Sequence, residues 1–246
     1  MCLMTRPLRP EKVIAELDTA HVAGYLLDGQ AGMALMLAIW TIDAYLAEAA
    51  VQEARLRRER RVLTRQMEEL ARTLARGEMV PRTRGRSRAN RFRAVHFYLS
   101  CWRIIDLHLT LVQRLSQLPE VRNALRPYRH TFRAYEKMRH HYEHFDERLP
   151  GQKHAKDLAV PGDLGNFAGH MLTFGGESVD VGPESLRLLK KIVGQALFAF
   201  KAAAVEKLAA EQPESLQGLL MPIRAKRITR HVERLLRRTP RAARSG

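Results

Sequence analysis

An apolar seam with alternating steps of three and four residues runs through the first third of this chain. Its positions are Leu35, Ile39, Ile42, Leu46, Ala49, Leu56, Leu63, Leu70 and Leu74, with Glu53, Arg60 and Met67 at the remaining steps. This spacing is that of a coiled-coil heptad. We expect one long helix over 31–76, because no glycine or proline interrupts the seam before Gly77. Its apolar first half should pack in the body of the protein, and its charged second half should project as a partly coiled-coil-like arm.

Further helices are expected after this arm. The segment 77–91 combines glycine, proline and many arginines, a composition that resists helix and strand alike, so it is interpreted as a basic flexible linker. Apolar residues at helical spacing then predict core helices within 92–149. We expect a helix from about Phe92 to near Pro119, and another from about Glu120 to Phe145.

The C-terminal third changes character before it returns to helix. β-branched and aromatic residues alternate with small ones around Gly175 and Gly176, which predicts a short β-hairpin within 160–182. Helices are expected over 183–238, and a disordered basic tail over 239–246. The fold class expected is therefore all-α: one domain over 1–246, formed by a helical bundle with a long arm and a short β-hairpin insertion.

The charge of the chain favours a polyanionic partner. Lys and Arg number 42 against 26 Asp and Glu, giving a formal net charge of +16. Such a surface attracts phosphates, and the partner we expect is RNA. A basic loop or tail that is merely solvated would show the same composition. The residues expected to contact RNA are Arg82, Arg84, Arg86, Arg88, Arg91, Arg129 and Arg133.

The compartment expected is the cytoplasm. Cys2 and Cys101 are the two cysteines, one near the N-terminus and one in a helical pattern, which fits a reducing environment and no disulfide framework. The most apolar stretch, Met33 to Ile42, is too short to cross a bilayer, and charged residues flank it. We therefore expect a buried helix and no membrane partner.

Histidine is concentrated in one segment, where it favours proton-transfer chemistry. His130, His140, His141 and His144 all fall within YRHTFRAYEKMRHHYEHFDERLPG, among several arginines. Cleavage of RNA through its 2′-hydroxyl needs a proton acceptor, a proton donor and positive charge at the phosphorus. His144 and Arg139 are suited to these roles without a metal. The alternative is an ordinary helix end whose Arg, His and Glu form local ion pairs.

The spacing of Arg139 and His144, with a polar residue after the arginine, resembles the R-x4-6-H motif of the HEPN superfamily. The resemblance implies an all-helical, metal-independent endoribonuclease with no cofactor, acting in toxin, stress or antiviral systems. Arg139 and His144 would be catalytic. The resemblance is also compatible with a protein partner or a cognate inhibitor. The supporting residues would be His140, His141, Tyr142, Glu143 and Asp146.

The resemblance also implies a homodimer. Five residues on an ideal helix turn about 500°, so the side chains of Arg139 and His144 point roughly 140° apart. In the family, motif helices from two subunits line one shared cleft. We therefore expect the aromatic-flanked face of the helix from Glu120 to Phe145 to lie near a two-fold axis.

Two other functions remain open. His140, Glu143 and His144 form the H-x-x-E-H arrangement of inverted zinc peptidases, although no further carboxylate ligand is evident on another helix. A non-enzymatic helical module that binds nucleic acid or protein through its basic arm and tail is the other alternative. Asp106 and His108 lie among apolar residues, and we expect them to form a core pair or to support the neighbouring helix.

Overall fold

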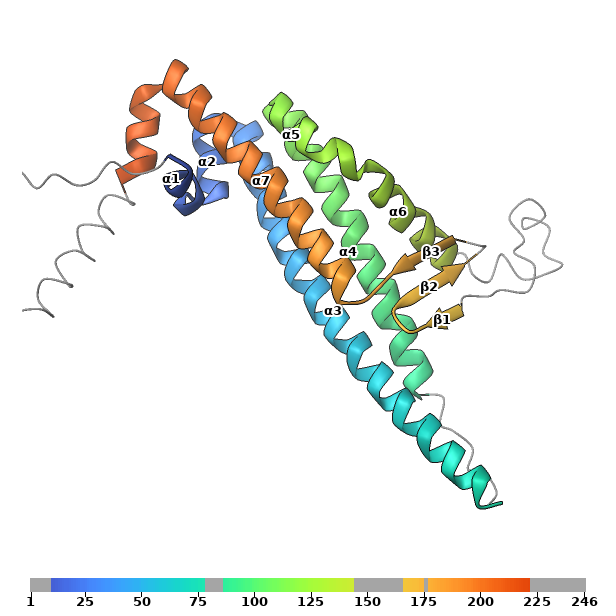
Figure 1. Cartoon of the computed structure of the whole chain (residues 1–246). Coiled ribbons are helices and arrows are strands. Elements are labelled where there is room, and N and C mark those ends of the chain that lie inside the picture. Colours follow the sequence, from blue (N-terminus) through green and yellow to red (C-terminus); the bar gives the residue numbers. More distant parts are fainter. Residues whose placement is uncertain (1–9, 78–85, 144–165, 175–176, 222–246) are drawn as a thin grey trace, which may run out of the picture.

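The computed structural model describes residues 10–77, 86–143, 166–174 and 177–221, and within them the fold is mainly helical, as predicted (Figure 1). The helices are α1 (Pro10–Glu16), α2 (Thr19–Leu26), α3 (Gly29–Ala75), α4 (Arg86–Ser116), α5 (Pro119–Leu125), the 3₁₀ turn η1 (Arg126–Tyr128), α6 (Arg129–Glu143) and α7 (Pro183–Glu211). The strands are β1 (Asn166–Ala168), β2 (Met171–Phe174) and β3 (Glu177–Asp180). A further helical segment covers 213–221.

The long helix expected over 31–76 is confirmed as α3, which runs from Gly29 to Ala75. The apolar seam is buried against α4, α2 and α7 as far as Leu56. Beyond that point Leu63, Met67 and Leu74 are exposed, and Figure 1 shows the end of α3 extending past the bundle. The change from an apolar to a charged composition along the helix therefore marks where the body ends and the arm begins.

Two predicted boundaries are wrong. The linker expected over 77–91 ends earlier, because α4 begins at Arg86 and no glycine or proline occurs from there to Ser116. The helix expected from Glu120 to Phe145 is broken into α5, η1 and α6. Pro127 explains the break, since proline lacks the amide hydrogen and clashes with the carbonyl of the preceding turn.

The predicted hairpin is confirmed as β2 and β3, and β1 adds a third antiparallel strand in the order β1-β2-β3. Leu172 pairs with Val179, and both side chains are buried together with Phe174. The expected turn at Gly175 and Gly176 lies outside the described residues, as do 144–165 and the predicted tail at 239–246. One face of this small sheet covers α6.

Aromatic stacking joins α4 to α6. The Trp102 and Tyr135 rings are parallel with centroids 3.7 Å apart, and Phe132 meets the Trp102 ring edge-on at 5.7 Å. The Tyr135 hydroxyl donates to the Asp180 carbonyl at 2.6 Å, while Tyr98 and Ser185 share a 2.7 Å hydrogen bond. These contacts fix α6, β3 and the start of α7 on the surface of α4.

Two short N-terminal helices were not predicted. The Asp18 carboxylate accepts a hydrogen bond from the backbone N–H of His21 at 2.9 Å and so caps α2. Lys201 of α7 donates to the backbone oxygens of Ala15 and Leu17 at the end of α1. An aspartate before a short apolar run was the available sequence signal, but each helix is too short to show a clear helical period.

Candidate functional site

Of the two predicted catalytic residues, only Arg139 lies within the described part of the chain. Arg139 lies on the last turns of α6, and its guanidinium donates to the Glu143 carboxylate one turn later. Their side chains are 24% and 28% exposed. His144 and Asp146 lie outside the described residues. A local ion pair at a helix end is therefore present, and its Glu143 carboxylate orients the Arg139 guanidinium.

The aromatic face of α6 points into the protein. The buried Tyr142 ring stacks on Phe92 at 4.4 Å, and its hydroxyl donates to the Phe92 carbonyl at 3.3 Å. Burial raises the pKa of Tyr142 well above its ordinary value. The buried His141 ring lies 5.3 Å from Phe174. The expectation that this face lies near a two-fold axis is wrong, because α4 and the sheet already cover it.

The remaining predicted side chains fall into different settings. His140 is exposed on α6, and Arg133 is exposed one turn after Arg129. Within the described ranges, no group of three His, Cys, Asp or Glu residues is placed to hold a metal ion. The zinc hypothesis depends on His144, which those ranges do not include.

Arg129 was predicted to contact RNA, but its guanidinium is used inside the fold. It donates to Asp106 at 3.3 Å, to the Thr110 hydroxyl at 3.1 Å and to the Gln113 side chain at 2.7 Å. Burial raises the pKa of Asp106, and the charge of Arg129 opposes that rise. Arg129 therefore attaches α6 to α4. Asp106 supports the neighbouring helix as expected, whereas His108 contacts the carbonyl of Ile104 instead of pairing with it.

Replacing Arg129 by methionine is expected to lower the free energy of unfolding by about 1–3 kcal/mol, because it leaves the half-buried Asp106 with fewer charged partners. Urea denaturation followed by circular dichroism measures this change. RNA affinity should stay within about twofold of the parent. Arg133→Met is the matched control, and a larger loss of stability in that variant would contradict the assignment.

The basic segment predicted to bind RNA continues into a helix. Arg82 and Arg84 lie outside the described residues, while Arg86 and Arg88 belong to the first turn of α4. Arg91 is half-buried on the same helix. The helix carries this part of the chain alongside the arginine-rich stretch of α3, because α3 and α4 pack antiparallel.

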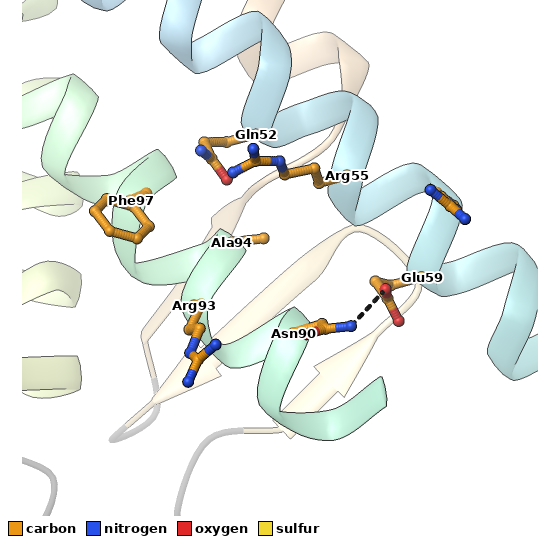
Figure 2. A pocket seen from close by; sticks show the side chains of 8 residues that line it. Gln52, Arg55, Glu59, Asn90, Arg93, Ala94 and Phe97 are labelled. Carbon is orange, nitrogen blue, oxygen red and sulfur yellow. Dashed lines mark hydrogen bonds between the residues drawn. The ribbon is translucent and has the colours of Figure 1, made fainter. Parts of the chain in front are cut away.

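A groove of about 330 Å³ lies where these two basic stretches meet, and we call it the α3/α4 groove (Figure 2). Arg55 and Arg58 enter it from α3, and Arg93 enters from α4. Figure 2 shows Arg55 extending toward Gln52, with Arg93 and Phe97 rising from the facing helix. The other lining residues are Glu59, Asn90 and Ala94.

The chemistry of the α3/α4 groove suits a phosphate-bearing ligand with flat bases. Within the described part of the chain, no hydrogen bond or ion pair engages the guanidinium groups of Arg55, Arg58 or Arg93. The Phe97 ring is 51% exposed at the groove wall. Glu59 is the one carboxylate in the lining, and it accepts a 3.5 Å hydrogen bond from Asn90. Three cations thus face one acid.

A second basic groove, of about 490 Å³, lies along the other side of α3. The buried carboxylate of Glu53 holds Arg57 at 3.7 Å and Arg60 at 3.5 Å on this side. Burial lowers the pKa of Arg60, and the charge of Glu53 opposes that effect. The lining residues are Arg57, Arg60, Arg61, Thr64, Arg65, Glu68 and His170. Arginines therefore surround this length of α3.

The sequence analysis interpreted the run RLRRERR as the charged exterior of an arm, and gave that arm a binding role only in the alternative of a non-enzymatic module. The sequence did indicate that this run is exposed on the helix, since Arg55 and Arg58 occupy helix positions outside the apolar seam. The sequence alone did not show that this run lies beside Arg93 and Phe97, which come nearly forty positions later in the chain. That pairing depends on the antiparallel register of α3 and α4.

The α3/α4 groove and the motif helix adjoin one another. Phe92, which stacks on Tyr142 of α6, directly precedes Arg93 of the groove. The C-terminal end of α6 is therefore attached to the first turns of α4. Searches against protein-family models, curated proteins and solved structures gave no match to this chain.

Proposed function

We propose that this protein binds single-stranded RNA through the α3/α4 groove. The observation that carries the proposal is the meeting of three guanidinium groups, which have no hydrogen-bond or ion-pair partner among the described residues, with the exposed ring of Phe97. Guanidinium groups neutralise the phosphates, and an aromatic ring provides a stacking surface for an unpaired base. The net charge of +16 supports the electrostatic part of the same interaction.

Single-stranded RNA fits this groove better than a duplex does. Bases in a duplex are stacked on one another, so a protein ring such as Phe97 reaches only an unstacked base. The exposed side-chain amide of Asn90, in the lining of the same groove, provides a donor and an acceptor of the kind that recognise base edges. The second groove, lined by arginines and His170, would hold further phosphates.

Phe97→Ala is expected to weaken binding of a fluorescein-labelled single-stranded oligoribonucleotide by about 1–3 kcal/mol, the usual contribution of one stacked base. Fluorescence anisotropy over a range of salt concentrations measures the affinity. The salt dependence should not change, because no cation is removed. Phe97→Trp should restore affinity, and Phe198→Ala, at an exposed phenylalanine on α7, is the control. Equal binding by Phe97→Ala and the parent would reject the stacking role.

We also propose that bound RNA is cut at the end of α6, in a metal-independent reaction using Arg139 and His144. The contact between Phe92 and Tyr142 favours this second function, since it attaches the motif helix to the helix that carries Arg93. His144 would exchange protons with the 2′-hydroxyl and the leaving oxygen, while Arg139 would stabilise negative charge at the phosphorus. Glu143 would orient that guanidinium.

His144→Ala is expected to abolish cleavage while leaving RNA affinity within about twofold of the parent, because the substitution leaves Arg55, Arg58, Arg93 and Phe97 of the α3/α4 groove in place. The assay incubates labelled RNA with purified protein in excess chelator and resolves the products on a denaturing gel. Binding without cleavage by the parent would leave the non-enzymatic module as the function. Cleavage that the chelator stops, together with bound zinc, would instead support the H-x-x-E-H hypothesis.

A further inference from the structure

An exposed apolar stripe runs along the side of α3 opposite its buried seam. Met33, Leu37, Trp40 and Val51 are 44–53% exposed and follow one another at helical spacing. Ala44 and Ala47, also exposed, fill the positions between Trp40 and Val51. No charged residue occupies the stripe. Large exposed apolar areas of this kind mark interaction sites in soluble proteins.

A second stripe lies on α4. Leu107 is 47% exposed, and Ile104 and Leu111 are half-buried one turn to either side of it. The α3/α4 groove shows that both stripes are on the same side of the helix pair. Val51 lies one turn before Arg55 on α3, and Ile104 lies two turns after Phe97 on α4, and both Arg55 and Phe97 line that groove. The two stripes together are called the outer face below.

We infer that the outer face binds a second copy of this chain, forming a four-helix arrangement with α3 and α4 of each protomer. An antiparallel helix pair with one apolar side is self-complementary, because a two-fold axis places the same side of each copy against the other. Ala44 and Ala47, in the middle of the α3 stripe, allow two helices to approach closely there. The inference does not depend on RNA binding.

The outer face is large enough for a specific dimer. From Met33 to Val51 a helix rises about 27 Å, and two adjacent helices are about 20 Å wide. The area buried would be roughly 500 Å² on each copy, or about 1,000 Å² in total, which is the minimum expected of a specific protein interface. The surrounding residues of α3 and α4 would add to this area.

Charge selects one orientation of the two copies. Arg55, Arg58 and Arg93 gather at one end of the outer face, while the other end has exposed Asp28 just before α3 and a single exposed arginine, Arg114, on α4. Parallel copies would bring two arginine clusters together, which costs electrostatic free energy. Antiparallel copies place the arginines of one protomer near Asp28 of its partner. The α3/α4 grooves then lie at opposite ends of the dimer.

A lipid bilayer is the competing occupant. α3 is long and apolar enough to span a membrane by length and composition, and only 28% of its most apolar window is buried. The stripe nevertheless covers one side of the helix, and Asp43 and Glu48 lie within the same stretch. A bilayer would surround such charges with hydrocarbon at high cost, whereas a protein partner leaves Asp43 in water.

Sedimentation of the purified full chain at micromolar concentrations tests the inference. The parent should sediment at twice the monomer mass of 28.2 kDa. The double variant Leu37→Glu/Trp40→Glu should sediment as a monomer, with a dissociation constant raised at least a hundredfold and an unchanged circular dichroism spectrum. Phe198→Glu, on α7, is the matched control and should remain a dimer. A monomeric parent, a dimeric double variant, or a parent that binds vesicles as a monomer would overturn the inference.

Cysteine crosslinking in a Cys2→Ser background tests the orientation. Cys101 does not interfere, because it is buried and burial raises the pKa of its thiol to about 12. Ala44→Cys, near the proposed axis, should form a crosslinked dimer with a short bismaleimide. Met33→Cys should not do so alone, but should crosslink when mixed with Val51→Cys. Efficient crosslinking of Met33→Cys with itself would overturn the antiparallel arrangement.

Discussion

Trp102→Ala should lower the free energy of unfolding by about 3–5 kcal/mol, the usual result of deleting a buried aromatic side chain. Trp102 is fully buried, stacks on Tyr135 of α6 and meets Phe132 edge-on. The substitution removes both contacts and leaves a cavity between α4 and α6. Because a domain of this kind is stabilised by only about 5–15 kcal/mol, the variant should be close to unfolding.

Urea denaturation followed by far-ultraviolet circular dichroism measures the effect on Trp102→Ala. Trp102→Phe keeps an aromatic ring and should lose less than half as much stability. Phe198→Ala, at an exposed position of α7, should change stability by no more than about 0.5 kcal/mol. A loss below about 1 kcal/mol for Trp102→Ala would show that α4 and α6 are not joined by this stack.

Arg55→Gln/Arg58→Gln/Arg93→Gln should reduce affinity for single-stranded RNA by at least a hundredfold at low salt. Each guanidinium that neutralises a phosphate releases bound counterions, so the slope of log affinity against log salt should fall by about 2. Anisotropy titrations at several salt concentrations measure both quantities. Glutamine preserves the length and polarity of the side chain, and all three residues are exposed, so the fold should be retained.

The matched control removes the same charge elsewhere. Arg114, Arg122 and Arg126 are exposed on α4, α5 and η1, outside both basic grooves. Their replacement by glutamine should lower affinity by less than about fivefold, through the weaker general field of the protein. If both triple variants lose affinity equally, binding depends on net charge and not on the α3/α4 groove.

Much of the fold could be predicted from the sequence, because its signals are local. The seam from Leu35 to Leu56 identified α3, and β-branched residues around Leu172 and Val179 identified the hairpin. The two wrong boundaries have different causes. Pro127 broke the helix that the aromatic spacing had suggested to be continuous, and the arginine-rich start of α4 is helical despite its loop-like charge.

The candidate site was less accessible to sequence reasoning, because its members come from distant segments. Arg129 has the same residue type as Arg93, but only the structure shows that Asp106, Thr110 and Gln113 occupy its guanidinium. The helical spacing of the aromatic residues in α6 predicts a buried face, but it does not show whether that face is buried inside the protomer or against a second copy. The stacking of Tyr142 on Phe92 identifies that face as internal.

Photo-crosslinking of RNA to the intact protein tests RNA binding in the α3/α4 groove, because it reports where bound RNA lies. Single-stranded RNA containing 4-thiouridine would be irradiated with the protein, digested with trypsin and analysed by mass spectrometry. RNA binding in the α3/α4 groove predicts crosslinks on the peptide from Ala94 to Arg103, which contains Phe97, and their loss in Phe97→Ala. Crosslinks confined to the basic segment 222–246, with none on the peptide from Ala94 to Arg103, would show that RNA does not bind in the α3/α4 groove.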